Sequence, residues 1–400
     1  MIQPAFMVGV TGTNGKTSVT QWIAQALCAR GRKCAIVGTL GNGFPGALVP
    51  GPNTTPGAHV LSEFLPESVR QGAQACAMEV SSIGLHQNRV AGIRFDVAVF
   101  TNLTRDHLEY HKTMEAYAAE KARLFDWPGL GCAALNLDDP FGRELAAKLK
   151  GRVRTIGYTL EDRSGADTVL RATGFAETDG GLGFTLDGIR CTAPVVGRFN
   201  ASNLLAVIGA LLAGDESLVD AAAALQHIAP PAGRMQPLGG AGEPLVVVDY
   251  AHSPDALEKV LMTLRATATG RGGRLVCVFG CGGDRDPGKR PQMGAIAERL
   301  ADRVVVTSDN PRGEEPQAII GAILAGMESA PTVEPDRAAA IAQVVAEADA
   351  RDVILLAGKG HEPYQEIAGV RLPFSDLDNA KSALAGRRSA GSPPTGERRC

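Results

Sequence analysis

A glycine-rich loop near the start of the chain has the pattern of a phosphate-binding turn. Residues 9–17 read Gly-Val-Thr-Gly-Thr-Asn-Gly-Lys-Thr and join a short apolar run, residues 5–10, to residues 18–30, where apolar side chains recur at helical spacing. Such a turn lets backbone N–H groups approach a polyphosphate, while Lys16 adds a full positive charge and Thr17 can ligate magnesium. The strict Walker pattern is not met, because Val10 occupies the position of its first glycine. We expect nucleotide binding on an α/β scaffold rather than a purely structural turn.

The composition is that of an ordinary soluble enzyme. The chain has 400 residues, 44% of them hydrophobic, and a formal charge of -3, which gives no reason to expect a nucleic-acid partner. No apolar run is long enough for a membrane span and no signal peptide follows Met1, so a cytoplasmic protein of two or three domains is expected. The eight scattered cysteines lack zinc-ligand spacing, and we expect most of them to be reduced and buried.

Apolar strand-like runs alternate with amphipathic helical runs along most of the chain. The strand-like runs are residues 75–80, 95–100, 133–137, 245–248, 275–279, 304–307 and 353–357. This alternation predicts an α/β fold with a central, mostly parallel P-loop ATPase-like sheet, followed by a Rossmann-like C-terminal α/β domain. Residues 168–195 instead contain short alternating segments separated by turns, which predicts a small antiparallel side sheet.

A Pro-rich joint at residues 229–233 separates the two predicted domains. We place a central ATP-binding domain at residues 1–233 and a C-terminal domain at residues 234–386. Residues 387–400 are polar and lack periodicity, so we expect a disordered tail.

Polar residues close two successive strand-like runs. Glu79 closes one of them, and residues 101–107 (Thr-Asn-Leu-Thr-Arg-Asp-His) close the next. Because open α/β sheets bind ligands at the carboxyl ends of their strands, Glu79 and His107 are expected to meet the phosphate loop. A carboxylate oxygen and a neutral imidazole nitrogen suit a divalent cation. Asp106 is an alternative metal ligand that the sequence leaves open.

Together these motifs resemble the Mur ligase family, whose members make peptidoglycan precursors. The resemblance rests on residues 11–17, 79–82 and 102–107, and it extends through residues 117–125, 197–203, 233–234 and 249–254. Several separate motifs in the right order are far more specific than one phosphate loop. The resemblance implies an ATP-dependent acid–amino-acid ligase that forms a C–N bond, with Mg²⁺ as cofactor and ATP as substrate.

The resemblance changes the interpretation of Lys121. This residue lies in a predicted helix, residues 114–125, where a lysine ordinarily faces solvent. A free ammonium would repel both magnesium and the phosphate-loop lysine, whereas a carbamate formed with carbon dioxide would be an anionic oxygen ligand. The resemblance implies that Lys121 is this carbamate, N6-carboxylysine.

The resemblance also implies roles for residues that match the family's motifs. The catalytic set is Lys16, Glu79, His107 and Lys121. The metal set is Thr17 and Glu79 for one cation, with Glu79, His107 and Lys121 for a second. The ATP set is Gly12, Thr13, Asn14, Gly15, Lys16, Thr17, Ser18, Asn203, Arg234, Asp249 and His252. The acceptor set is Asn53, Thr54, Thr55, Ser81, Gln87 and Arg89. Ile83 departs from the family pattern, which often has a histidine after Ser-Ser.

The sequence Asp-Asn-Pro-Arg at residues 309–312 indicates which amine the ligase uses. In the family this form is associated with meso-diaminopimelate, and the guanidinium fork of Arg312 suits the second carboxylate that lysine lacks. The implied diaminopimelate set is Arg285, Asp309, Asn310, Arg312, Gly358 and Glu362. The alternative is that Arg312 is a surface arginine after a proline turn. The expected reaction is addition of meso-diaminopimelate to UDP-N-acetylmuramoyl-L-alanyl-D-glutamate through an acyl phosphate, in peptidoglycan precursor synthesis.

The start of the chain leaves two other functions open. The family normally has an N-terminal domain of about a hundred residues that anchors the uridine diphosphate, and we expect that domain to be absent from this chain. A fragment, a short relative, or a chain completed by a separate N-terminal domain would each account for this; otherwise we expect a monomer with small-molecule substrates. One alternative function is another amide ligase of the superfamily, such as a folylpolyglutamate synthetase, which would not need Arg312. The other is a non-catalytic nucleotide-binding subunit, against which the retained catalytic set argues.

Overall fold

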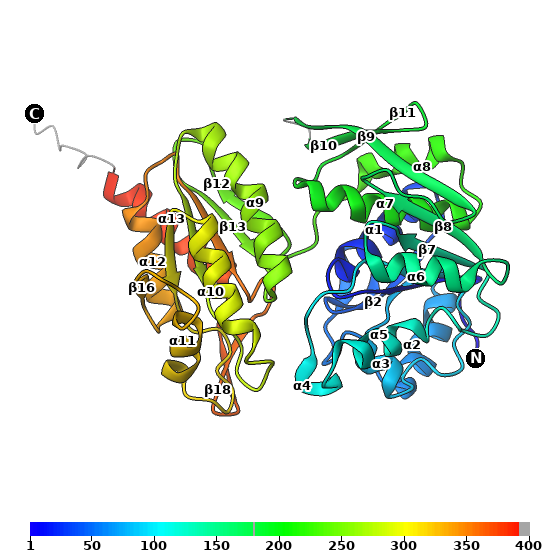
Figure 1. Cartoon of the computed structure of the whole chain (residues 1–400), viewed down its shortest axis with the longest axis horizontal. Coiled ribbons are helices and arrows are strands. Elements are labelled where there is room, and N and C mark those ends of the chain that lie inside the picture. The colour runs from blue at the N-terminus through cyan, green and yellow to red at the C-terminus, as the bar shows by residue number, and fades with distance from the viewer. Residues whose placement is uncertain (179–180, 392–400) are drawn as a thin grey trace, which may run out of the picture. The chain divides into compact units, whose positions relative to one another are not determined.

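The chain forms two compact units in the computed structural model, which describes residues 1–178 and 181–391 (Figure 1). The first unit is Met1–Pro231 and the second is Ala232–Cys400, a division two residues before the boundary expected after residue 233. Each unit has its own sheet with helices around it, which confirms the predicted α/β fold class. Within the described ranges, no helix combines the length and apolar character that a membrane span requires.

An eleven-stranded sheet forms the first unit. The strands lie in the order β11 (Ile189–Ala193), β10 (Gly181–Leu186), β9 (Thr168–Thr178), β8 (Arg154–Thr159), β7 (Cys132–Asn136), β6 (Val97–Phe100), β1 (Phe6–Thr11), β5 (Ala75–Glu79), β2 (Cys34–Gly38), β3 (Gly41–Phe44) and β4 (Ala47–Val49). Pairing is parallel from β2 to β9 and antiparallel at both edges. The ends of β1, β5, β2 and β6 therefore meet at one edge of the sheet, where the phosphate loop begins.

The predicted antiparallel strands at residues 168–195 are present, and they form one side of the eleven-stranded sheet. Strand β9 is long enough to serve two neighbours, because residues 168–171 pair in parallel with β8 and residues 172–178 pair antiparallel with β10. The antiparallel strands thus continue the central sheet at its edge.

Helices pack on both faces of this sheet. Alternate residues of β1 point to opposite sides, so that Phe6 and Val8 belong to one hydrophobic core and Met7 to the other. The first core includes Trp22 and Leu204, and the second includes helix residues of α2, α3 and α6. The helices are α1 (Lys16–Ala29), α2 (Ala58–Arg70), α3 (Ser82–His86), α4 (Leu108–His111), α5 (Met114–Ala122), α6 (Pro140–Leu149), α7 (Arg198–Ala213) and α8 (Leu218–Ala224), followed by the 3-10 turn η1 (Leu225–His227).

The second unit contains a six-stranded sheet. Its order is β12 (Gln236–Gly239), β13 (Leu245–Asp249), β17 (Val353–Ala357), β14 (Leu275–Phe279), β15 (Arg303–Val306) and β16 (Thr332–Val333), with only β12 antiparallel to its neighbour. The helices are α9 (Pro254–Arg271), α10 (Lys289–Leu300), α11 (Pro316–Leu324), α12 (Arg337–Glu347) and α13 (Asp376–Gly391), and a hairpin of β18 (Tyr364–Ile367) and β19 (Val370–Pro373) follows β17. The valine- and leucine-rich strands β14 and β17 are buried along their whole lengths, as expected for central parallel strands.

The end of the chain differs in part from the expectation of a disordered tail after residue 386. Helix α13 continues to Gly391, and residues 392–400 lie outside the described residues. Cys400 is among them, and the other seven cysteines are free, with all but Cys28 buried. The described cysteines thus agree with the expected reduced state.

A buried ion pair joins the last two helices of the second unit to its sheet. The guanidinium of Arg337 donates to both carboxylate oxygens of Asp376 at 2.7 Å, and both side chains are fully buried. Arg337 also donates to the carbonyl oxygens of Ser308 and Ala357, at the ends of β15 and β17. One arginine therefore fixes the two strand ends that carry part of the predicted diaminopimelate set.

Removing the charge of Asp376 should destabilise the second unit. Asp376→Asn should lower its free energy of unfolding by about 3 kcal/mol, because Arg337 would remain buried without its counter-charge. Both tryptophans, Trp22 and Trp127, lie in the first unit. Denaturant unfolding followed by circular dichroism should show the loss, while the transition reported by tryptophan fluorescence should not move.

The control for this substitution is an exposed ion pair in the same unit. Glu258→Gln breaks the pair that Glu258 forms with Arg299 at 2.7 Å. It should change the unfolding free energy by less than about 0.5 kcal/mol. A loss in Asp376→Asn no larger than in this control would contradict the anchoring role.

Candidate active site

The phosphate loop is held by the segment that follows β6. Asn102 accepts a hydrogen bond from Asn14 N through its side chain (2.9 Å) and from Thr13 N through its carbonyl (2.8 Å). Lys16 Nζ folds back over the loop and donates to the carbonyl oxygens of Gly12 (2.9 Å) and Thr13 (2.8 Å). The lysine thus lies along the loop that the sequence assigned to the phosphates.

Glycine is required at Gly15 for two reasons. Its φ of +85° is left-handed, and a Cβ at this position would lie 2.5 Å from Asn203 Oδ1. Asn203, on α7, is itself buried and held by a hydrogen bond to Asn200. The predicted ATP residue Asn203 therefore touches the phosphate loop directly, and Thr17 and Ser18 are buried in the first turn of α1.

Glu79 lies at the centre of the site, at the end of β5, and is 1% exposed. Its Oε2 accepts from the hydroxyls of Thr17 and Thr39, both at 3.1 Å, and its Oε1 accepts from Thr39 N at 2.9 Å. Thr39 was missed by sequence reasoning. The position of Thr39 could have indicated its role. It directly follows β2, which pairs with β5, and the carboxyl ends of these parallel strands meet at the same edge of the sheet.

Lys121 is buried against the same loop and does not face solvent. Its side chain is 1% exposed, its Nζ donates to Gly12 O at 2.8 Å, and it lies 4.2 Å from the ring centre of Tyr117. Burial and the nearby charge of Lys16 hold the pKa of the Lys121 amine well below its usual value. Since both lysines donate to one carbonyl, a neutral Lys121 avoids placing two ammonium groups on it. A neutral amine is the form that reacts with carbon dioxide.

His107 adjoins this cluster through Tyr117. Their ring centres are 6.1 Å apart, and the Tyr117 hydroxyl donates to Thr13 Oγ1 at 3.2 Å. His107 Nε2 lies 3.5 Å from Asp106 Oδ2, and its Nδ1 lies 3.6 Å from Glu109 Oε1. Both candidate ligands, His107 and the alternative Asp106, therefore lie beside each other.

The donor types at Glu79 fit magnesium. The Thr17 hydroxyl and the Glu79 carboxylate supply hard oxygen atoms 3.1 Å apart at the start of a helix. Within the described residues, no group of three or more His, Cys, Asp and Glu side chains could hold a metal. The predicted metal set contains only two residues of those types, so this finding leaves the assignment of Thr17, Glu79, His107 and Lys121 as a prediction.

Most of the predicted acceptor residues form one hydrogen-bonded network. Thr55 Oγ1 donates to Glu79 O (2.8 Å) and accepts from Ser81 N (2.9 Å), and Arg89 donates to Thr55 O (2.8 Å) and to Gln87 Oε1. The remaining two members are Thr54, which contacts Thr39 at 3.0 Å, and Asn53, which is exposed. The network connects directly to the backbone of Glu79.

The predicted ATP residues divide between the two units. Arg234, Asp249 and His252 belong to the second unit and lie around Tyr250, whose ring centre is 4.5 Å from the Arg234 guanidinium and 4.6 Å from the His252 ring. Asp249 accepts a hydrogen bond from Met235 N at 2.7 Å, and burial raises its pKa. His361 lies against the same tyrosine, and burial, with a smaller effect of Arg234, lowers its pKa to about 4.

The predicted diaminopimelate residues gather at the ends of β14, β15 and β17. Asn310 Nδ2 donates to Glu362 Oε2 at 2.7 Å, and a Cβ at Gly358, which has a φ of +115°, would clash with Asp309. Lys359 bridges the pair, since its fully buried Nζ donates to Asn310 Oδ1 (3.0 Å) and Glu362 Oε2 (3.1 Å). Sequence reasoning missed Lys359, because a lysine is rarely fully buried.

Arg312 and Arg285 approach one glycine from two loops. A Cβ on Gly282 would lie 2.7 Å from Arg312 Nη1 and 3.7 Å from Arg285 Cγ. Arg312 also donates to Gly283 O at 2.8 Å, and its backbone bonds to β18 through Glu366 O. Arg312 thus contacts both the Gly282–Gly283 loop and β18, and its role in diaminopimelate binding stays a prediction.

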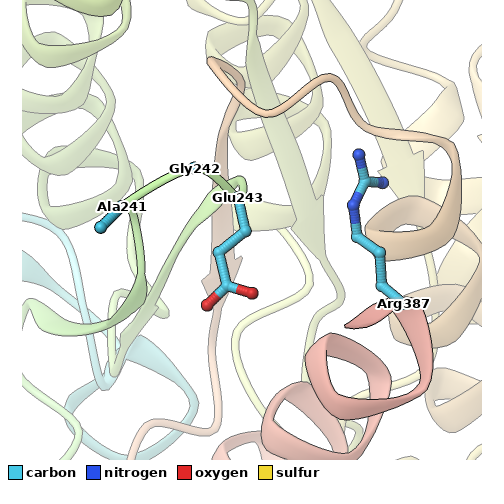
Figure 2. Close-up of a pocket in the computed structure, with 4 residues that line it drawn as sticks. All are labelled: Ala241, Gly242, Glu243 and Arg387. Carbon is cyan, nitrogen blue, oxygen red and sulfur yellow. The ribbon is translucent and has the colours of Figure 1, made fainter. Parts of the chain in front are cut away.

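A separate pocket of about 380 Å³ lies in the second unit (Figure 2). It is lined by Ala241, Gly242, Glu243 and Arg387, and it contains none of the predicted site residues. We do not assign a ligand to it.

Comparisons with known proteins agree with the two-unit arrangement. The Mur ligase middle domain model matches residues 10–211, and the Mur ligase, glutamate ligase domain model matches residues 233–360. A protein of Chromobacterium violaceum named UDP-N-acetylmuramoyl-L-alanyl-D-glutamate–2,6-diaminopimelate ligase is 55% identical over 94% of this chain and 77% of its own length. A Pseudomonas aeruginosa protein of the same name is 56% identical over 95% and 78%.

Solved structures give the same result for the fold. A structure titled as that of a UDP-N-acetylmuramoyl-L-alanyl-D-glutamate–2,6-diaminopimelate ligase is 38% identical, with a TM-score of 0.67 over 97% of this chain and 80% of that one. A folylpolyglutamate synthase of Mycobacterium tuberculosis in complex with ADP has a TM-score of 0.69 at 20% identity over 98% and 91% of the two chains, which shows a shared fold alone.

A methyl group added to Gly15 should disable the phosphate loop. Gly15→Ala should weaken ATP binding by at least roughly tenfold, because the new Cβ meets Asn203 and the left-handed φ is disfavoured. Gly31→Ala is the control, since Gly31 has a similar φ of +79° but nothing within 4 Å of the added Cβ. Titration with a fluorescent ATP analogue measures both variants, and equal affinities would contradict the assignment.

Proposed function

The chain belongs to the Mur ligase family, and from this premise we propose that it joins meso-diaminopimelate to UDP-N-acetylmuramoyl-L-alanyl-D-glutamate at the expense of ATP. The observation that carries the proposal is the identity of 55–56%, over 94–95% of the chain, with two proteins named for this reaction. The cluster of Asn310, Arg312 and Glu362 supports the choice of amine, because it offers groups of both charges at the strand ends. ATP and a nucleotide-linked acceptor as substrates support a place in the cytoplasm.

The first step would activate the acceptor. A carboxylate is a poor electrophile, so the glutamate side-chain carboxylate attacks the γ-phosphorus of ATP, an acyl phosphate forms, and ADP leaves. Lys16, and the loop N–H groups that do not bond to Asn102, would stabilise the charge that moves onto the bridging oxygen and ADP. The acceptor would lie along the Thr55, Ser81 and Arg89 network, which leads to Glu79.

Magnesium would be held by Thr17 and Glu79, with Glu79, His107 and carbamylated Lys121 serving a second cation. When bound, it would neutralise negative charge on the phosphate oxygens. The chain's own contribution is to hold the donors: Thr39 fixes both oxygens of Glu79, and the burial of Lys121 lowers the pKa of its amine, which favours the neutral form that carbamylation needs.

The second step would form the amide. A neutral amine of diaminopimelate attacks the carbonyl of the acyl phosphate, the nitrogen loses a proton, and the tetrahedral intermediate expels phosphate. Arg312 and Arg285 would bind the carboxylate distant from the reacting amine, and Glu362 would bind the distant ammonium. Lysine has no such carboxylate, so these arginines would discriminate against it.

Phosphate release from ATP should identify the amine. With magnesium and the muramoyl-dipeptide acceptor, wild-type chain should release phosphate with meso-diaminopimelate and at least roughly a hundredfold more slowly with L-lysine. Arg312→Ala should reduce kcat/KM for diaminopimelate by roughly a hundredfold, because the guanidinium that pairs with the substrate's second carboxylate is lost. Turnover with L-glutamate on a folate acceptor would favour a folylpolyglutamate synthetase, and ATP binding without any turnover would favour a non-catalytic subunit.

The proposed carbamate role of Lys121 can be tested by removing the side chain and supplying a small carboxylate in solution. Lys121→Ala should lower kcat by at least roughly a hundredfold, because an anionic ligand at the phosphoryl-transfer site is lost. High concentrations of short carboxylates or bicarbonate should restore part of this activity. Lys148→Ala is the control, since Lys148 is an exposed helix lysine paired with Asp126. Full activity of Lys121→Ala without additives would refute the carbamate role.

A further inference from the structure

Two loops that carry the diaminopimelate arginines have strained backbones. Asp284, directly before Arg285, has a φ of +52°, and Arg312 itself has a φ of +53°. Left-handed conformations of non-glycine residues persist where their surroundings hold them, and they concentrate at functional sites.

One carboxylate, that of Glu314, ties the first loop to the second. Glu314 lies two residues after Arg312, and its Oε1 accepts from Asp284 N at 2.7 Å. This bond fixes the strained residue that precedes Arg285. The two loops also bond to each other directly: Gly283 N donates to the backbone oxygen of Asn310 at 2.9 Å, and Gly313 N donates to the side-chain oxygen Oδ2 of Asp284 at 3.0 Å.

Glu314 is in turn held by a buried arginine. Arg290 on α10 donates to both oxygens of Glu314, at 2.8 and 2.9 Å, and its side chain is 5% exposed. The bidentate bond to Arg290 lowers the pKa of Glu314 and keeps it ionised. Arg290 also reaches Gly282 O at 3.4 Å, in the loop itself.

We propose that Glu314, fixed by Arg290, is a positioning residue that sets the spacing of Arg285 and Arg312 and thereby selects an amino acid with a second carboxylate. The inference rests on the proposed function, whose substrate set does not include Glu314 or Arg290. Neither residue has to touch the substrate. They act through the two loops, because one carboxylate satisfies the N–H of one loop while belonging to the other.

Glu314→Gln tests the inference. The amide keeps the shape of the side chain, and its single oxygen can accept from Asp284 N and one Arg290 N–H group. The second Arg290 bond, to Oε2, is lost, because an amide NH₂ group then faces Arg290 Nη1, and the charge that holds Glu314 on Arg290 is removed. We expect KM for diaminopimelate to rise by roughly tenfold, while kcat at saturating diaminopimelate and KM for ATP stay within about twofold. Hydrogen exchange of residues 282–285 should become faster, and that of β14 should not change.

The control is Glu347→Gln, which alters an Arg–Glu pair of the same unit, with Arg303 at 2.7 Å, away from both loops. It should leave KM for diaminopimelate unchanged. An unchanged KM in Glu314→Gln, a parallel rise in KM for ATP, or the same effect in the control would overturn the positioning role.

The wild-type chain separates this inference from the proposed function. If it used another amino acid with a second carboxylate in place of diaminopimelate, the proposed function would fail. The inference would stand if Glu314→Gln raised the KM for that amino acid. If diaminopimelate were the substrate and its KM did not respond to Glu314→Gln, only the inference would fail. A chain with no amine substrate at all would overturn both.

Discussion

The arrangement of the first unit depends on one buried carboxylate, that of Glu79. A carboxylate removed from water is costly unless it is hydrogen-bonded, and Glu79 accepts from Thr17 and twice from Thr39. These bonds join the ends of β5 and β2 to helix α1, which follows the phosphate loop. The backbone carbonyl of Glu79 accepts a hydrogen bond from Thr55 and so also fixes the segment that carries the predicted acceptor residues. One buried charge therefore couples the nucleotide and acceptor sides of the proposed reaction.

In the second unit, buried cations instead of a buried carboxylate hold the strand ends together. Lys359 and Arg337 are both fully buried, and each is surrounded by acceptors from separate strand ends. Lys359 fixes Asn310 and Glu362, and Arg337 fixes the backbone that precedes each of them, at Ser308 and Ala357. Buried charged side chains thus fix the loops that would discriminate among amino acids. The ion pair of Glu314 and Arg290 fixes the neighbouring segments that carry Arg285 and Arg312 in the same way.

Much of this could be predicted from the sequence, where the determinants are local. The strand, loop and helix around Lys16 follow from glycine spacing and periodicity, and strand ends placed Glu79 beside them. Residues whose role depends on strand register could not be found in this way: Thr39 matters only because β2 lies next to β5. Likewise β9 changes partners midway, which joins the antiparallel strands to the main sheet. Residue type also misleads for Lys121. A helix lysine ordinarily faces solvent, but Lys121 is buried because it packs against the phosphate loop.

The central claim is that the acceptor carboxylate is activated by phosphorylation at the Glu79 site, and isotope transfer tests it most directly. The glutamate side-chain carboxylate of the acceptor would be labelled in both oxygens with ¹⁸O, and the phosphate released during ligation with diaminopimelate would be analysed by mass spectrometry. The account predicts one ¹⁸O in each phosphate, because the oxygen that attacks ATP leaves with the phosphoryl group. Amide formation with unlabelled phosphate would contradict it.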